Sequence, residues 1–133
     1  MVEPSMTESE FPSRIPVEFT IENVCTLNGE LRTVLAPKTV GRIISLLPIN
    51  SRLHLWNQEA YFGVGARIGP EKAVMQCKSG DLAYWPQGDA VCLFFKDMTP
   101  FSKVNPIGRI STTALEGVFE RIRTGTMIRF SRS

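Results

Sequence analysis

Aromatic and carboxylate side chains that could form a ligand site are concentrated in two stretches of this chain. Both tryptophans and both tyrosines lie there, Trp56 and Tyr61 in the first stretch and Tyr84 and Trp85 in the second. These side chains combine an apolar body with a polar tip and suit the walls of ligand pockets. The first stretch also contains Glu59, whose pKa would rise in aromatic surroundings, so that it could take or give a proton.

If the two stretches form neighbouring strands, about 4.8 Å apart, their side chains can share one concave face. We expect such a site, with one carboxylate and one guanidinium, to bind a small polar ligand or an extended peptide. The alternative is a packed interior in which the rings only fill volume and Glu59 pairs with a base such as Arg109. The predicted ligand-binding residues are Trp56, Glu59, Tyr61, Phe62, Tyr84, Trp85, Phe95 and Arg109.

The sequence assigns no catalytic residue and predicts no metal or cofactor. His54 is the only histidine, so no pair of histidines can bind a metal ion. A structural or surface role for it is favoured over that of a general base. Cys92 lies within an apolar run and is interpreted as a core residue, not a nucleophile. Asp81 follows a glycine and is interpreted as a turn residue that accepts backbone hydrogen bonds.

Composition limits the class of protein. A chain of 133 residues with 43% hydrophobic content is one domain with enough apolar side chains for a core. No apolar stretch is long enough to span a bilayer. The polar, acidic start is unlike a signal peptide, so we expect a cytoplasmic location. Three cysteines without CxxC spacing predict neither disulfides nor a zinc site. The bases are scattered singly, so a nucleic-acid partner is not expected.

The stretch 80–95 organises the predicted fold. Two apolar runs, 82–85 and 90–95, flank Pro86–Asp89, which predicts a tight reversal between two strands. The second run is continuous, as in a strand buried on both faces. Near the start, alternation of apolar and polar residues over Val17–Glu22 predicts a strand with one solvent-exposed face. Asn28-Gly29 predicts a two-residue hairpin turn before a strand over 31–36.

Further apolar patterns complete the predicted architecture. Stripes at helical spacing predict helices over Pro37–Leu47 and Thr113–Arg123. Short strands joined by turns favour a mainly β fold, a closed antiparallel barrel of about eight strands with the two helices. We expect the barrel over residues 15–133 and a flexible leader over residues 1–14. The remaining predicted strands are 52–56, 60–64, 72–77, 107–111 and 126–130.

Two motifs are the most specific, Gly80-Asp81-Leu82-Ala83-Tyr84-Trp85-Pro86 and Gly108-Arg109-Ile110. With Trp56-x-x-Glu59-x-Tyr61-Phe62, they resemble the small prokaryotic cyclophilin-like proteins over roughly residues 17–130. The resemblance implies the cyclophilin barrel and no settled activity. One departure is Lys96-Asp97 after Phe95, where a glycine is more usual.

The same segments also resemble true cyclophilins, the peptidyl-prolyl isomerases. Matched residue by residue, Phe95 corresponds to the aromatic floor of the proline pocket. Leu93 replaces the glutamine that binds the peptide backbone, and Leu55 replaces the isomerase arginine. Because that arginine weakens the resonance of the prolyl amide, the resemblance implies inefficient isomerisation.

Two classes of function remain open. The first is a binding domain for a small molecule or peptide, with no nucleic-acid or membrane partner. The second is an enzyme, either a weak prolyl isomerase or a subunit of a small-molecule amide-processing enzyme, because barrels resembling cyclophilins occur in amide-bond carboxylases and hydrolases. The sequence does not indicate an oligomeric state.

Overall fold

The first two strands follow from strict alternation of apolar and polar residues. In the computed structural model, which describes residues 13–113 and 115–133, β1 (Arg14–Ile21) pairs with β2 (Cys25–Arg32). Every second side chain of β1 is at most 2% exposed and faces the core. The other elements are η1 (Thr33–Leu35), α1 (Pro37–Leu46), β3 (Ile49–Arg52), β4 (His54–Trp56), β5 (Glu59–Gly63), β6 (Asp81–Trp85), β7 (Ala90–Phe94), β8 (Asn105–Ile110), α2 (Leu115–Arg121) and β9 (Met127–Arg132).

The nine strands form one antiparallel sheet in the order β3-β9-β1-β2-β8-β6-β7-β5-β4. The strands at its two ends, β3 and β4, are consecutive in the chain and are separated only by the buried Leu53. One half of this segment pairs with β9 and the other half with β5. The sheet therefore closes into a barrel, which confirms the predicted fold class.

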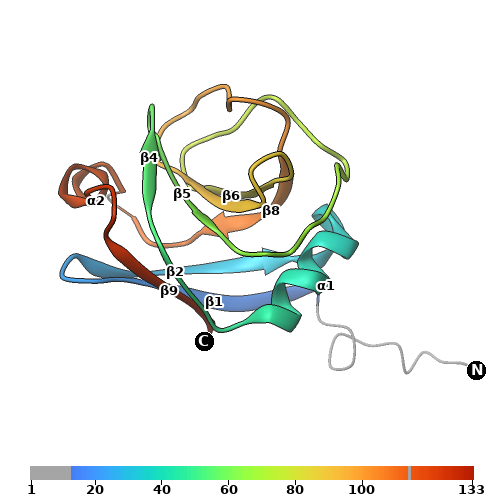
Figure 1. Ribbon diagram of the computed structural model, residues 1–133, viewed down its shortest axis with the longest axis horizontal. Coiled ribbons are helices and arrows are strands. Elements are labelled where there is room, and N and C mark those ends of the chain that lie inside the picture. The colour runs from blue at the N-terminus through green and yellow to red at the C-terminus, as the bar shows by residue number, and fades with distance from the viewer. Residues whose placement is uncertain (1–12, 114) are drawn as a thin grey trace, which may run out of the picture.

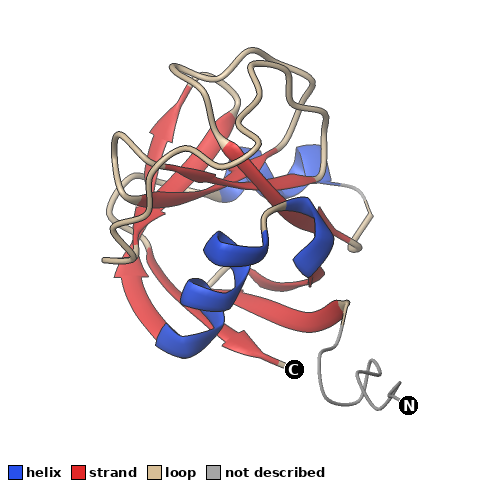
Figure 2. Cartoon of the chain, turned by 90° about the vertical axis from the view of Figure 1, so that its right-hand side faces the viewer, coloured by secondary structure: helices blue, strands red, loops and turns tan. Residues whose placement is uncertain are grey.

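The helices lie on opposite sides of the barrel (Figure 1). α1 buries Val40 and Ile43 at 0% exposure against the core, as the helical stripe predicts. α2 is shorter than the predicted 113–123. The long connections from β5 to β6 and from β7 to β8 gather at one end of the barrel (Figure 2). No helix in the described part of the chain has the length and apolar character to cross a membrane.

The predicted turn at Asn28-Gly29 is wrong, since both residues lie inside β2 opposite Glu18 and Val17. The reversal comes earlier, where Asn23 takes the left-handed conformation at φ 62°. Gly29 is required for a different reason: a Cβ on it would lie 2.7 Å from the carbonyl oxygen of Arg109 on β8. The glycine thus permits close strand approach, and it does not make the turn.

Two further differences concern element boundaries. The segment 72–77, predicted as a strand, is a loop with two isolated bridges, Val74 to Val104 and Cys77 to Met98. The predicted strand over 31–36 gives way to η1 after Arg32. Residues 1–12, which make up most of the predicted leader, lie outside the described residues, and β1 begins at Arg14.

Candidate functional site

Strand pairing places several of the predicted site residues on one face of the sheet. Tyr61 of β5 lies opposite Cys92 of β7, and Cys92 lies opposite Ala83 of β6. Directly opposite residues of antiparallel strands point to the same side, as do residues two apart in one strand. Glu59 and Trp85 therefore join this face, which is the side of the sheet turned away from the barrel interior.

A pocket of about 200 Å³ lies on this outer face. Its floor and walls come from β4, β5, β6 and β7, and its remaining wall comes from the connection between β7 and β8. Four of the eight predicted residues line it, together with four others. The lining residues are Trp56, Glu59, Tyr61, Trp85, Cys92, Pro100, Phe101 and Val104.

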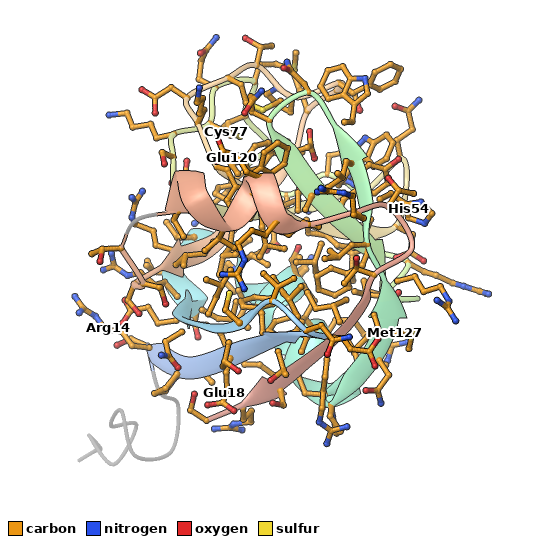
Figure 3. The ribbon with its side chains drawn as sticks, turned by 90° about the vertical axis from the view of Figure 1, so that its left-hand side faces the viewer. Arg14, Glu18, His54, Cys77, Glu120 and Met127 are labelled. Atoms are coloured by element: carbon orange, nitrogen blue, oxygen red, sulfur yellow. The ribbon has the colours of Figure 1, made fainter. Side chains whose placement is uncertain are left out.

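The aromatic rings of the pocket contact one another edge to face. Tyr61 meets Trp85 at 82° with ring centroids 5.7 Å apart. Phe101 lies 5.9 Å from Trp85 and 5.8 Å from Trp56. Phe101 is 65% exposed and Trp56 is 40% exposed, so these two rings form the mouth of the pocket. His54 stacks on Tyr61 with centroids 5.3 Å apart and lies at the surface (Figure 3).

The orientation of Trp85 is determined by contacts on two sides. Its indole Nε1 donates a 2.6 Å hydrogen bond to Oγ of Ser102, which donates in turn to Oε1 of Gln87 at 2.9 Å. Its ring packs on Gly88, where an added Cβ would lie 2.2 Å from a ring carbon. The hairpin and the loop after β7 thus hold the ring in place.

Glu59 is a carboxylate at the floor of the pocket, only 4% exposed. Burial raises its pKa, and a hydrogen bond from the Cys92 thiol partly opposes that rise. The ion pairs among residues 13–113 and 115–133 join Glu30 to Arg14 and Arg32, and Asp81 to Arg109, and none includes Glu59. The carboxylate therefore has a hydrogen-bond donor but no positive partner within the described chain.

The nearby thiols remain protonated. Burial, with the charge of Glu59 and its hydrogen bond, raises the pKa of the Cys92 thiol, which is 1% exposed. Burial and the charges of Asp81 and Glu59 raise the pKa of Cys77 to about 12. Since the thiolate is the reactive form, neither sulfur is a nucleophile at neutral pH. Within the described residues no three His, Cys, Asp or Glu side chains gather as a metal site requires.

Three of the predicted residues lie on the opposite face of the sheet, in the barrel interior. Phe62 is 0% exposed and meets Phe130 edge to face, and Phe95 is 1% exposed and packs on Phe119. Tyr84 is 0% exposed, and its hydroxyl donates to Asp89 at 2.6 Å. Burial, together with that hydrogen bond, raises the pKa of Tyr84 to about 12.

These three side chains face the interior because successive side chains of a strand point to opposite faces of the sheet. Phe62 follows Tyr61 and Tyr84 precedes Trp85, so within each pair the two side chains point to opposite faces. Phe95 falls just past the end of β7 and joins Leu93 in the core cluster, whereas Cys92 and Phe94 belong to the outer cluster. These three aromatic residues support the barrel and do not line the pocket.

Arg109 also lies outside the pocket. Its guanidinium pairs with Asp81 and donates a 3.0 Å hydrogen bond to the carbonyl of Ser79. No guanidinium of the described residues therefore lines the aromatic pocket, and the alternative pairing of Arg109 with Glu59 does not occur. Asp81 accepts a 2.8 Å hydrogen bond from the backbone N–H of Lys78, consistent with its interpretation as a turn residue.

Sequence reasoning missed four lining residues, Cys92, Pro100, Phe101 and Val104. The burial of Cys92 supports its interpretation as a core residue, and the alternation of side chains along β7 indicates which face it lies on. The other three lie in or next to an irregular connection without periodicity, so no local pattern marks them as part of a site.

A closed antiparallel barrel with helices on two sides is the architecture of a cyclophilin-like protein. The chain belongs to this family, described as cyclophilin-like, which matches residues 14–131. The hypothetical protein AF2241 from Archaeoglobus fulgidus has a similar structure, with a TM-score of 0.77 and 29% identity over 91% of this chain and 96% of that one. No curated protein matches the sequence.

Two other solved structures are similar in fold. McbB, determined in complex with tryptophan, has a TM-score of 0.73 and 12% identity, with 88% of this chain and 44% of that chain covered. The cyclophilin of Mimivirus has a TM-score of 0.54 and 13% identity, with 90% and 86% covered. At these identities the likeness concerns the fold alone.

Proposed function

We propose that this chain is a binding protein for a small organic molecule, or for one side chain of a peptide, and that the ligand occupies the pocket lined by Trp56, Glu59 and Phe101. The observation that carries the proposal is Glu59, a nearly buried carboxylate with no ion-pair partner in the described chain. A buried charge without a partner costs stability. A residue that lowers stability inside a concave aromatic site is typical of a functional site.

Efficient prolyl isomerisation is not part of this proposal. Leu93, in the position of the cyclophilin glutamine, is 0% exposed. Leu55, in the position of the isomerase arginine, packs against the core cluster. Phe95 is 1% exposed and lines only a small hollow of about 60 Å³, with Phe119 packed on it. These positions supply neither the hydrogen-bond donors nor the apolar surface that isomerisation of a bound peptide would use.

The McbB structure is compatible with a small-molecule ligand, at the level of the fold only. A barrel of similar fold is present there in a protein determined with tryptophan. The likeness is limited to the fold, since the two chains share 12% identity.

Intrinsic fluorescence provides a direct test, because both tryptophans of the chain line the pocket. We would screen a fragment panel of amines, carboxylic acids, neutral amides and dipeptides for a change in tryptophan emission. We expect hits whose affinity falls at least about tenfold in Phe101→Ala. Phe101 is 65% exposed, so its removal should alter stability little.

Val34→Ala is the matched control, because Val34 is 61% exposed but does not line the pocket. It should change neither binding nor stability. The absence of hits in every chemical class, or hits unaffected by Phe101→Ala, would refute the proposed function.

A further inference from the structure

We propose that the ligand of this pocket is an organic ammonium ion, whose positive group lies against the Glu59 carboxylate and between the aromatic rings. This inference rests on the proposed function and names the chemical class of its ligand. It follows from the charge, the shape and the size of the pocket taken together.

The pocket holds one acidic side chain and no basic one among its lining residues. None of the eight lining residues is Lys, Arg or His, and Glu59 is the single carboxylate among them. The titratable groups that face it are the Tyr61 phenol, which lines the pocket, and the thiols of Cys92 on β7 and Cys77 on the loop before β6, both thiols with raised pKa values. An anionic ligand would be repelled, a neutral ligand would leave the carboxylate unpaired, and a cation would compensate it.

Two bases of neighbouring strands make contacts outside the pocket. Arg109 pairs with Asp81, and His54 stacks on Tyr61 without lining the pocket. The Cys92 thiol donates to the carboxylate, so it occupies only part of the acceptor capacity of Glu59. The remaining capacity is open to a donor that enters from the pocket.

The aromatic rings form walls at steep angles to one another. Tyr61 and Trp85 meet at 82°, Trp85 and Phe101 at 73°, and Trp56 and Phe101 at 90°. All four rings line the same pocket, and their planes are steeply inclined to one another. The negative face of an aromatic ring attracts ammonium groups, and tryptophan does so most strongly. A box of two tryptophans, a tyrosine and a phenylalanine above a carboxylate therefore has the chemistry of a cation site.

Size restricts the ligand further. About 200 Å³ is smaller than the roughly 300–1,000 Å³ of pockets for drug-sized ligands. The pocket can hold a short amine or the amine-bearing end of a longer molecule that leaves through the mouth at Trp56 and Phe101. The ammonium group could belong to a free metabolite or to a lysine side chain of a peptide.

The test compares isosteres that differ in charge. Choline and 3,3-dimethylbutan-1-ol have the same shape, one with a quaternary nitrogen and the other with a carbon at the same place. n-Butylamine and butan-1-ol form a second pair. Each is titrated into the full chain at pH 7 with tryptophan emission as the signal. We expect each cation to bind at least about tenfold more tightly than its neutral partner.

Two variants test whether the preference for cations over neutral isosteres comes from Glu59. In Glu59→Gln the charge is lost while the shape is kept, so the cation preference should disappear. Glu30→Gln is the matched control, since Glu30 is a carboxylate that pairs with Arg14 and Arg32 outside the pocket. A measurement on the unmodified chain serves as a second test: choline binding should weaken as the pH falls through the raised pKa of Glu59, because choline keeps its charge.

A peptide with one trimethyllysine, compared with free choline, distinguishes the two sources of the ammonium group. Equal binding of the charged and neutral isosteres, or a cation preference that survives in Glu59→Gln, would overturn the ammonium inference. Absence of binding by all four small probes would overturn it as well. The proposed function would still stand if neutral or anionic fragments of the wider panel bind and lose affinity in Phe101→Ala.

Discussion

At the scale of single residues, Glu59 is the one carboxylate among the pocket residues, and it is buried. It is 4% exposed and has no ion-pair partner in the described chain. Burial raises its pKa, so its ionised form is less stable in the folded protein than in the unfolded chain. This cost is consistent with a residue retained for a ligand, since functional sites often lower stability.

The stability effect of Glu59 has a defined sign. A carboxyl group with a folded pKa above 4.5 binds more protons in the folded state, so its contribution is favourable in acid and is lost as the pH rises through the folded pKa. We therefore expect Glu59→Gln to stabilise the fold at pH 8 by about 0.5–2 kcal/mol. Glutamine keeps an acceptor for the Cys92 thiol.

Urea unfolding of both proteins at pH 8 and pH 4 measures this effect, and the difference should shrink at pH 4. Destabilisation by Glu59→Gln at pH 8 would mean that the carboxylate has a structural role instead.

Prolyl isomerisation is a second residue-scale prediction. Leu93 and Leu55 stand in the positions of the cyclophilin glutamine and arginine, and neither can donate a side-chain hydrogen bond. The uncatalysed barrier of about 20 kcal/mol should therefore remain nearly unchanged. An assay on a proline peptide, with a true cyclophilin as positive control, measures the rate of cis–trans isomerisation. Acceleration comparable to the control, abolished by a change at Phe95, would contradict the prediction.

At the scale of elements, α1 is capped by a residue far away in the sequence. Ala36 at the N-cap position provides no side-chain acceptor. Glu71 instead accepts hydrogen bonds from the backbone N–H groups of Lys38 at 3.0 Å and Thr39 at 2.9 Å, and from the Thr39 hydroxyl at 2.7 Å. Asn105 on β8 accepts from the N–H of Glu71 at 2.8 Å. The loop before β6 thus joins α1 to the barrel.

Removal of this cap should destabilise the fold. We expect Glu71→Gln to cost about 0.5–2 kcal/mol at pH 7, the usual range for loss of a helix cap. Burial alone would raise the pKa of Glu71, but the hydrogen bonds from Thr39 and Lys38 outweigh it and lower the pKa. The stabilisation is therefore present above the unfolded pKa and is lost as the pH falls through the lower folded value.

Chemical unfolding of Glu71→Gln and of the unmodified chain at pH 7 and pH 3 measures both the size of the stability loss and its pH dependence. Glu22→Gln, at an exposed carboxylate in the turn after β1, is the control and should be neutral. A loss of stability in Glu71→Gln that does not decrease at low pH would argue against the charged cap.

At the scale of the whole molecule, the barrel depends on the close approach of β2 and β8. Gly29 lies opposite Ile110 and Gly108 lies opposite Leu31. A Cβ on Gly108 would lie 2.0 Å from the carbonyl oxygen of Glu30, and this backbone atom cannot move without displacing the strand. The pairing of β2 with β8 joins the β3-β9-β1-β2 half of the sheet to the half that holds the pocket.

We expect Gly108→Ala to cost about 1–3 kcal/mol or more, as overpacking of a well-packed core does. Gly41→Ala is the matched control, because Gly41 is exposed in α1 and an added Cβ meets nothing within 4 Å. It should stabilise the fold by about 0.5–1 kcal/mol through helix propensity. Thermal unfolding of both variants measures the difference, and equal stability of the two would contradict the close approach of these strands.

The sequence by itself determined the fold class, most of the strands, both helices and the two aromatic stretches that meet at the pocket. Each of these depends on a pattern within one segment, such as the alternation in β1 or the helical stripe of α1. A segment with one apolar face can bury it in few ways, so the pattern and the element agree. The family resemblance over nearly the whole chain reinforced the barrel.

Tertiary structure alone decided which aromatic residues face the pocket and what surrounds Glu59. Tyr61 and Phe62 are equally aromatic neighbours, and only the burial of one sheet face against the core separates them. Asn28-Gly29 has the composition of a turn, but its glycine is required by β8, about eighty residues away. Phe101 reaches the site from a loop without periodicity. Contacts between distant segments determine these features, and no local pattern encodes them.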